Sequence, residues 1–341
     1  MQILNIESFL KESKSGYILD VRSPAEFEHG HIPGAISFPL FSNIERHNVG
    51  LCYKQNGPGK ALLLGLEIVG PKLADFVRKA EIYRDKPLFV HCWRGGMRSN
   101  SMAMLLKTAG HEVHLLKKGY KAYRNSVLEQ FEKPFKIVNL AGYTGTAKTE
   151  ILSELAALGE QMVDLEGIAM HKGSAFGNLS DDKQPSSEQF ENNLAARLLA
   201  MNVNKSIYVE DEGLCIGSVK LPLGFFKAMQ HAPMLFIIRS KAHRIKNLLS
   251  TYSDYNDAES SKAAFIRIGK RLGGQNVKEA IEAIDNNDAQ KAIEIALNYY
   301  DKYYYAKLNK RQFSRFIKVD GSDSNTVVAH KIIAKTEIIY G

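Results

Sequence analysis

The stretch that decides the fold reads His91-Cys92-Trp93-Arg94-Gly95-Gly96-Met97-Arg98-Ser99. The apolar residues before it, 88–90, are typical of a buried parallel strand, and the apolar spacing from residue 99 onward is typical of a helix. Cys92 therefore lies where a strand gives way to a helix. Similar strand and helix patterns alternate along the rest of the chain, which predicts an α/β fold.

The loop after Cys92 has the composition of an anion site. Gly95 and Gly96 let the backbone curl so that its N–H groups converge, and the N-terminus of the next helix adds positive partial charge. Arg94 and Arg98 add two full charges to this predicted anion cradle. Such surroundings stabilise a thiolate, so Cys92 is the candidate catalytic nucleophile. The alternative is a buried and inert cysteine, which needs no glycines and arginines around it.

Two further motifs lie upstream, Asp20-Val21-Arg22 at a predicted strand end and the turn His31-Ile32-Pro33-Gly34-Ala35. Together with the cysteine loop, they resemble the rhodanese superfamily. Rhodanese loops commonly place the arginine five residues after the cysteine, whereas Arg98 is the sixth residue after Cys92. The longer spacing resembles the rhodanese-like and cysteine phosphatases. Sulfur or selenium transfer and phosphate ester hydrolysis are therefore both open interpretations, and we expect Asp20 and Arg22 to be structural.

The composition is that of an ordinary globular protein. The 341 residues suffice for two domains, with 45% hydrophobic and 24% charged residues. We expect no signal peptide at Met1 and no membrane partner, because no apolar run is long enough to span a bilayer. Three cysteines cannot form a disulfide framework, so we expect a cytoplasmic protein. The net charge of +8 is compatible with a polyanionic partner such as RNA.

Residues 41–60 are polar, contain glycine and have no clear period, which predicts a long functional loop. Cys52 lies in this segment, either as a second thiol for Cys92 or as a bystander. Further along, residues 132–134 interrupt the alternation of strands and helices. We therefore predict one domain over residues 1–132 and another over residues 133–341.

The second predicted domain opens on a phosphate-binding pattern. A predicted strand over residues 136–140 is followed by Gly142-Tyr143-Thr144-Gly145-Thr146-Ala147-Lys148-Thr149 and then a helix. This is the context of a P-loop, where backbone N–H groups cradle phosphates and the lysine reaches them. Ala147 occupies a position where the pattern has glycine. The predicted phosphate-binding residues are Gly142, Gly145, Lys148 and Thr149, and the alternative is a strand–turn–helix junction without a ligand.

Residues 206–209 form an apolar strand that ends in three acids. This resembles a Walker B strand, in which a carboxylate holds Mg²⁺ directly or through water. Asp211 and Glu212 are the predicted acidic residues of that strand end. The alternative is a solvated acidic turn, since acids at strand ends are common in α/β domains.

The C-terminal part is predicted to be helical, with tyrosines between residues 299 and 305 among basic residues. Basic residues mixed with aromatic ones bind RNA through phosphate contacts and base stacking. The candidate RNA contacts are Arg267, Arg271, Lys307 and Arg311. A packed helix with tyrosine edges at the surface is the alternative.

A set of short motifs occurs in order along nearly the full chain: Tyr53-Lys54-Gln55, the cysteine loop, Asp164-Leu165-Glu166-Gly167, Pro185-Ser186, Phe190-Glu191-Asn192, Val209-Glu210-Asp211-Glu212 and Arg271-Leu272-Gly273-Gly274-Gln275. Together they resemble the tRNA 2-selenouridine synthase family, a rhodanese-like α/β domain followed by a P-loop NTPase-like α/β domain with a helical C-terminal part. The resemblance implies a transferase that converts wobble 2-thiouridine in tRNA to 2-selenouridine. It implies selenophosphate as selenium donor and an S-geranyl intermediate made from geranyl diphosphate. No cofactor is implied firmly, although Mg²⁺ suits the phosphate loop. The alternative is a rhodanese-like sulfurtransferase or a cysteine-dependent phosphatase fused to a nucleotide-binding domain.

Overall fold

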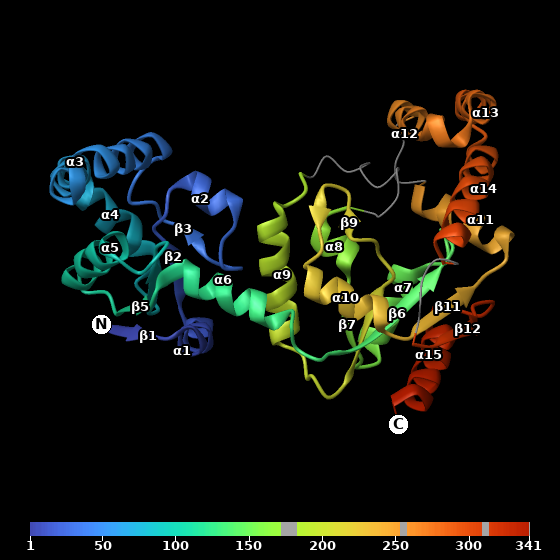
Figure 1. The fold of residues 1–341 in the computed structure, drawn as a ribbon, viewed down its shortest axis with the longest axis horizontal. Coiled ribbons are helices and arrows are strands. Elements are labelled where there is room, and N and C mark those ends of the chain that lie inside the picture. The colour runs from blue at the N-terminus through green and yellow to red at the C-terminus, as the bar shows by residue number, and fades with distance from the viewer. Residues whose placement is uncertain (172–182, 253–257, 309–313, 341) are drawn as a thin grey trace. The chain divides into compact units, whose positions relative to one another are not determined.

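The computed structural model describes residues 1–171, 183–252, 258–308 and 314–340 (Figure 1). Its contacts divide the chain into two units. The first contains Met1–Gln130 and Glu191–Ala196, and the second contains Phe131–Phe190 and Arg197–Gly341. The boundary predicted after residue 132 lies close to the division after residue 130.

The first unit is a five-stranded parallel sheet with the order β1-β5-β4-β2-β3. Its central strand β4 is buried at every residue, as expected of a strand covered on both faces. Leu19 and Val90 of neighbouring strands share one core with Phe76, Met102 and Leu106 from the flanking helices. The strands are β1 (Gln2–Leu4), β2 (Tyr17–Asp20), β3 (Ile36–Ser37), β4 (Leu88–His91) and β5 (Val113–Leu116).

Helices α1 to α5 fill the connections between the strands of this unit, and α6 follows its last strand. They are α1 (Ile6–Glu12), α2 (Pro24–His29), α3 (Asn43–Val69), α4 (Leu73–Ala80), α5 (Met97–Thr108) and α6 (Gly119–Gln130). Short 3-10 turns cover Ser13–Ser15, Gly70–Lys72 and Glu81–Tyr83. The strand ending at His91 and the helix beginning at Met97 confirm the predicted strand–loop–helix around Cys92.

The prediction of a loop over residues 41–60 is wrong, because helix α3 covers nearly all of it. Ser42 and Glu45 form a reciprocal capping box, with Glu45 N–H donating to Ser42 Oγ (3.3 Å) and Ser42 N–H to the Glu45 carboxylate (2.9 Å). Gly57 has a φ of 84° and Pro58 lacks an N–H, so the helix is kinked there. The helix buries few apolar side chains and leaves leucines such as Leu63 exposed, so the sequence shows no amphipathic period.

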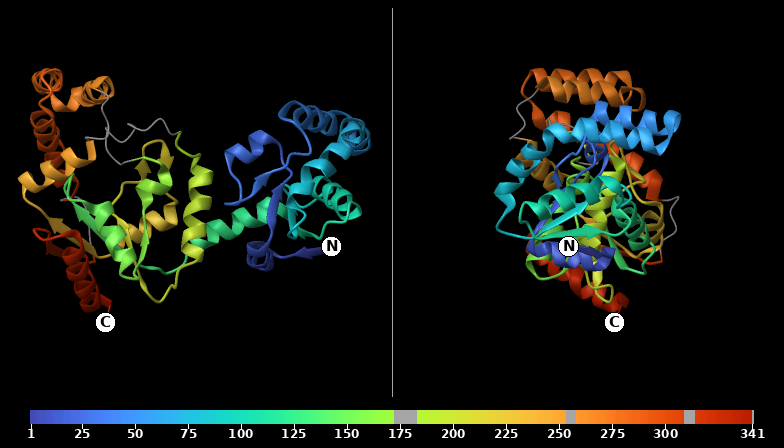
Figure 2. Two further views of the ribbon diagram at one scale, coloured as in Figure 1. Left: turned by 180° about the vertical axis from the view of Figure 1, so that it is seen from behind. Right: turned by 90° about the vertical axis from the view of Figure 1, so that its left-hand side faces the viewer.

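The second unit is built on a five-stranded parallel sheet with the order β12-β11-β6-β8-β7 and a small antiparallel hairpin. Helices α7 and α15 share a core with strands β6 and β11 on one face of the sheet (Figure 2). The strands are β6 (Lys136–Gly142), β7 (Gln161–Val163), β8 (Ser206–Glu210), β9 (Cys215–Ile216), β10 (Val219–Lys220), β11 (Met234–Ile238) and β12 (Phe316–Asp320).

The remaining helices flank this sheet or form the helical C-terminal part, in which α12 and α13 lie side by side. They are α7 (Lys148–Ala157), α8 (Leu165–Ala169), α9 (Ser187–Leu199), α10 (Leu223–His231), α11 (Lys241–Tyr252), α12 (Ala258–Leu272), α13 (Gly274–Asp285), α14 (Ala289–Leu308) and α15 (Asn325–Tyr340). Two parallel sheets with alternating helices confirm the predicted α/β class. None of the described helices combines the length and the apolar character needed to cross a bilayer.

Candidate functional site

The Cys92 thiol lies at the carboxyl end of strand β4, where the chain turns into helix α5. The residue is only 3% exposed. Its Sγ lies 3.2 Å from the hydroxyl oxygen of Ser99, and this hydroxyl donates its one hydrogen to the carbonyl of Gly96 (3.2 Å), which leaves its oxygen free to accept from the Cys92 thiol. Ser99 lies in the first turn of α5, so the helix places a hydroxyl group beside the sulfur. Sequence reasoning quoted Ser99 in the motif but assigned it no role.

Two glycines bring the cysteine loop against the start of helix α6. Gly95 has a φ of 65°, and a Cβ there would lie 2.8 Å from the carbonyl oxygen of Leu116. Gly119 has a φ of 59°, and its Cβ would lie 2.3 Å from the carbonyl oxygen of Cys92. Tyr120 N–H donates to this same carbonyl (2.8 Å). Neither position leaves room for a side chain, whereas Gly96 faces open space.

The two arginines of the predicted cradle have different surroundings. Arg94 is exposed, whereas Arg98 donates to both carboxylate oxygens of Glu26 in helix α2, at 2.7 and 3.3 Å. Burial opposes ionisation of Glu26, but the hydrogen bond and charge of Arg98 hold the pKa of that carboxyl below its usual value. The charge of Arg98 is therefore already paired with α2 in this structure.

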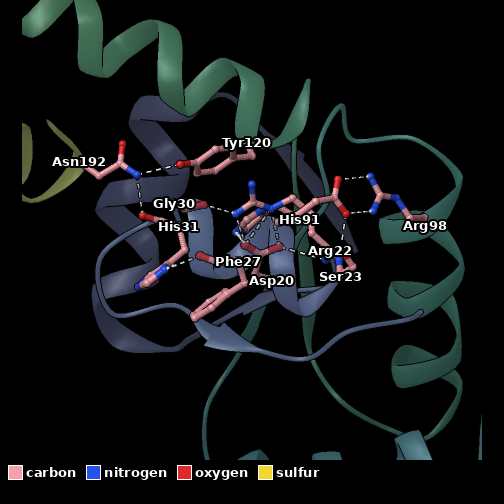
Figure 3. A network of polar contacts seen from close by, with 11 residues as sticks. Asp20, Arg22, Ser23, Phe27, Gly30, His31, His91, Arg98, Tyr120 and Asn192 are labelled. Atoms are coloured by element: carbon pink, nitrogen blue, oxygen red, sulfur yellow. Dashed lines mark hydrogen bonds and ion pairs between the residues drawn. The ribbon is translucent and has the colours of Figure 1, made fainter. Parts of the chain in front are cut away.

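A buried polar network lies next to the cysteine loop (Figure 3). Arg22 donates to both oxygens of Asp20 and to the carbonyl of Gly30 (2.6 Å), which ties the end of β2 to the turn after α2. Burial opposes ionisation of Asp20, but His91 and Arg22 together lower its pKa below the usual value. This is the structural role expected for Asp20 and Arg22.

Residues 191–196 of helix α9 complete the network in the first unit. The fully buried Asn192 donates to the hydroxyl of Tyr120 (2.7 Å) and to the carbonyl of His31 (2.9 Å). The ring of Tyr120 lies 3.7 Å from the guanidinium carbon of Arg22. The sequence places Asn192 in a family motif but gives it no role, because its partners are more than 70 residues away in the chain.

The phosphate loop of the second unit connects β6 to α7, and its predicted residues lie together there. Gly142 and Gly145 have positive φ angles, 159° and 84°. Lys148 and Thr149 begin helix α7, so both side chains lie at the positive end of the helix dipole. Ala147 adopts a left-handed conformation (φ 61°, ψ 42°), which explains why glycine occupies this position in the general pattern.

Replacing Ala147 with glycine is expected to stabilise the protein by about 0.5 kcal/mol. Relief of left-handed strain, about 1 kcal/mol, exceeds the added flexibility of the unfolded chain. The midpoint of urea unfolding measures this change. Gly145→Ala is the opposing control and should destabilise, because its Cβ would lie 2.8 Å from the carbonyl oxygen of Arg244. A clear loss of stability in Ala147→Gly would contradict the assignment of strain.

Among the acids at the end of β8, Glu210 is hydrogen-bonded to a residue of the phosphate-binding pattern, Thr149. Its Oε1 accepts from the Thr149 hydroxyl (2.9 Å), and its Oε2 accepts from the backbone N–H groups of Leu165 (3.1 Å) and Glu166 (3.3 Å). Asp211 instead accepts from the Tyr304 hydroxyl of helix α14 (2.9 Å). The sequence analysis proposes Asp211 and Glu212 for this role rather than Glu210. The sequence does not show the strand register that pairs Glu210 with Leu140 of β6, the strand that leads into the phosphate loop.

These acids lie in a strongly negative and buried environment. Burial raises the pKa of Glu210 to about 7, and the charges of Glu166 and Asp164 add to the effect of burial. Burial also raises the pKa of Glu212, with Glu166 adding to it, while Lys148 opposes the shift. A cation beside the loop would favour the ionised form of both groups. Within the described ranges, however, no three His, Cys, Asp or Glu side chains converge in a metal-binding arrangement.

Glu210 predicts a pH dependence of stability. The Glu210 carboxyl holds its proton more tightly in the folded state than in the unfolded state. The free energy of unfolding should therefore decrease as the pH rises from 4.5 to 7. This single group accounts for a fall of roughly 3 kcal/mol. Unfolding measured across this pH range should show a flatter profile for Glu210→Gln than for the native chain. Parallel profiles would show that Glu210 titrates normally.

The basic and aromatic residues of the C-terminal part meet on helices α12 and α14. Arg267 and Arg271 are exposed on α12, and the guanidinium carbon of Arg271 lies 5.9 Å from the ring centre of Tyr303. The rings of Tyr299 and Tyr303 stack at 6.4 Å. The predicted contact Arg311 and the side chain of Lys307 lie outside the described part of the structure.

Both parts of the chain match known families. Residues 135–334 match the family described as the tRNA 2-selenouridine synthase AAA domain, and residues 6–126 match the rhodanese-like domain. The chain belongs to the tRNA 2-selenouridine synthase family. This confirms the resemblance drawn from the motifs and the two-part fold predicted with it, and it places the chain among enzymes.

Similar tRNA 2-selenouridine synthases match this chain over most of its length. The protein named tRNA 2-selenouridine synthase from Shewanella frigidimarina is 34% identical over 331 residues, which cover 86% of this chain and 89% of that protein. The one from Pseudomonas syringae pv. tomato is 33% identical over 323 residues, which cover 84% and 87%. The family assignment therefore rests on both units of the chain and on the order in which they occur.

Proposed function

We propose that this chain replaces the C2 sulfur of wobble 2-thiouridine in tRNA with selenium from selenophosphate, through an S-geranyl-2-thiouridine intermediate formed from geranyl diphosphate. One observation carries the proposal. A cysteine loop and a phosphate loop occur in one chain, in the order in which this synthase family has them. The two loops suit the two different reactions that this conversion requires.

The first reaction would occur at the phosphate loop. A neutral thiocarbonyl sulfur leaves a pyrimidine poorly, whereas a geranylated sulfur leaves as a thiol. Alkylation of that sulfur by geranyl diphosphate requires a site that holds the departing diphosphate. The N–H groups of the loop, the N-terminus of α7 and the ammonium group of Lys148 offer such a site.

Mg²⁺ fits the same site. In P-loop proteins, the loop threonine and a strand-end carboxylate are the groups that hold this ion. Here the Thr149 hydroxyl and the Glu210 carboxylate lie 2.9 Å apart and would hold it together with the phosphate oxygens. The bound ion would neutralise negative charge on the diphosphate. It would also favour the ionised form of Glu210, whose pKa is otherwise raised by burial.

The second reaction would use Cys92. The loop between β4 and α5, with Cys92 and Ser99 side by side, suits binding of selenophosphate. Its selenium would displace the geranylated sulfur from C2 as geranylthiol, and water would then cleave the P–Se bond and release phosphate. The six-residue spacing to Arg98 also favours a second candidate, a cysteine-dependent phosphatase. That alternative predicts Cys92-dependent release of phosphate from an aryl phosphate without tRNA, and a rhodanese-like sulfurtransferase predicts sulfur transfer from thiosulfate.

Binding of tRNA tests the proposal against a transferase that acts on small molecules. Phosphate contacts release counterions, so tRNA affinity should weaken steeply as salt rises. Changing Arg267, Arg271, Lys307 and Arg311 to alanine should reduce the slope by about 1 for each tRNA phosphate that is no longer neutralised. Weak native binding that is insensitive to salt would contradict a tRNA substrate. Strong binding with equal slopes for the two proteins would place the tRNA surface elsewhere, for example on helix α3.

A further inference from the structure

Two side chains of helix α11 donate hydrogen bonds to backbone carbonyls of the phosphate loop. Arg244 is 4% exposed, and its Nη1 donates to the carbonyl of Thr144 (3.2 Å). Asn247, three residues further along the helix, donates through Nδ2 to the carbonyl of Gly145 (3.0 Å). Two consecutive carbonyls of the loop are therefore bound by one helix.

These bonds fix the direction of the loop's peptide groups. In a planar trans peptide the C=O and the following N–H point in opposite directions. Binding of the Thr144 carbonyl by Arg244 therefore turns the N–H of Gly145 away from α11. Gly145 itself fits closely against the helix, because a Cβ there would lie 2.8 Å from the carbonyl oxygen of Arg244 and 3.0 Å from Leu248.

The charge of Arg244 is already neutralised within the protein. Its Nη1 and Nη2 donate to the two carboxylate oxygens of Asp301 on helix α14, at 2.8 and 2.6 Å. Its guanidinium carbon also lies 5.3 Å from the ring centre of Tyr143 in the loop. A buried arginine with a bidentate carboxylate partner serves better to position backbone than to bind a ligand phosphate.

We propose that the Arg244–Asp301 pair, assisted by Asn247, is the positioning device of the phosphate loop and makes the loop's shape depend on helix α14. Loss of the Arg244 guanidinium, or of the Asp301 carboxylate that orients it, would free the Thr144 carbonyl and let the Gly145 peptide rotate. Phosphate binding would then weaken even though no group that touches the phosphate had changed. This inference goes beyond the proposed reaction, because it applies to any phosphate that the loop holds, and the proposed function enters only in the choice of diphosphate as probe.

The test compares four variants of the full chain. Three variants each weaken or remove some of the hydrogen bonds that position the loop: Arg244→Lys, Asp301→Asn and Asn247→Ala. Asn298→Ala is the matched control, because it removes another bond between α11 and α14, the 3.0 Å bond from Lys241 Nζ, without touching the loop. The affinity for inorganic diphosphate is measured by calorimetry. Hydrogen exchange of the peptide covering residues 142–149 reports the loop itself.

We expect about tenfold weaker diphosphate binding in Arg244→Lys and Asp301→Asn, because each variant removes a buried charged hydrogen bond. We expect a smaller loss of diphosphate affinity in Asn247→Ala. Hydrogen exchange of the loop should be faster in all three variants, whereas Asn298→Ala should match the native chain in both measurements. Native affinity and native exchange in Arg244→Lys and Asn247→Ala would overturn the proposal, as would equal losses in Asn298→Ala. If the native chain does not bind diphosphate, the proposed substrate of the loop is wrong, and the exchange rates still decide whether Arg244 positions the loop.

Discussion

Cys92→Ser is expected to abolish 2-selenouridine formation, with a loss of roughly 1,000-fold or more, as for other enzymes that lose their nucleophile. A serine hydroxyl is a much weaker nucleophile than a cysteine sulfur, so serine cannot take over the chemistry of Cys92. The change replaces one buried atom and keeps a polar contact to Ser99, so the fold should survive. Nucleoside analysis of the modified tRNA by mass spectrometry measures the loss.

The other two cysteines provide matched controls. Cys52 lies on helix α3, and Cys215 is exposed on the hairpin strand β9. Both are free thiols. Cys215→Ser should retain native activity. Cys52→Ser distinguishes the two roles considered for Cys52. It should reduce 2-selenouridine formation if Cys52 is a second thiol for Cys92, and it should leave formation unchanged if Cys52 is a bystander. Normal 2-selenouridine formation by Cys92→Ser would remove Cys92 from the mechanism.

Lys148→Ala is expected to reduce geranylation of 2-thiouridine tRNA by about 100-fold, the loss typical of one removed group that stabilises a departing anion. Lys148 begins helix α7, where its ammonium group would bind the diphosphate as it leaves. Selenation of tRNA supplied already geranylated should change much less, because no diphosphate leaves in that step. The two half-reactions are measured separately with purified tRNA substrates.

Lys220→Ala is the control for this prediction. It removes an exposed lysine from strand β10 of the same unit and should leave both half-reactions unchanged. Equal loss of both half-reactions in Lys148→Ala would contradict the assignment of geranylation to the phosphate loop. Strong ATP turnover that depends on Lys148 would instead favour an NTPase step.

The sequence predicts those parts of the site that depend on local signals. The loop at Cys92 and the loop at Lys148 both follow a short apolar strand and precede a helix, so residues within a few positions of each other specify the turn. Ala147 is a further local signal, because its left-handed conformation could be anticipated from the glycine that it replaces.

The parts that the sequence does not predict depend on long-range packing. Glu210 reaches Thr149 because β8 pairs with β6 in one register, and Arg244 reaches the carbonyl of Thr144 across 100 residues of chain. Helix α3 was predicted as a loop because its leucines face outward and leave no apolar period, although its capping box at Ser42 is a local signal that could have revealed it.

Reconstitution with the purified protein shows whether this one chain carries out both steps on tRNA. tRNA containing wobble 2-thiouridine is incubated with geranyl diphosphate, with selenophosphate, or with both, and its nucleosides are identified by mass spectrometry. We expect S-geranyl-2-thiouridine with geranyl diphosphate alone and 2-selenouridine only when both are present. Formation of 2-selenouridine from selenophosphate alone, or no reaction of the tRNA under any of these conditions, would contradict this expectation.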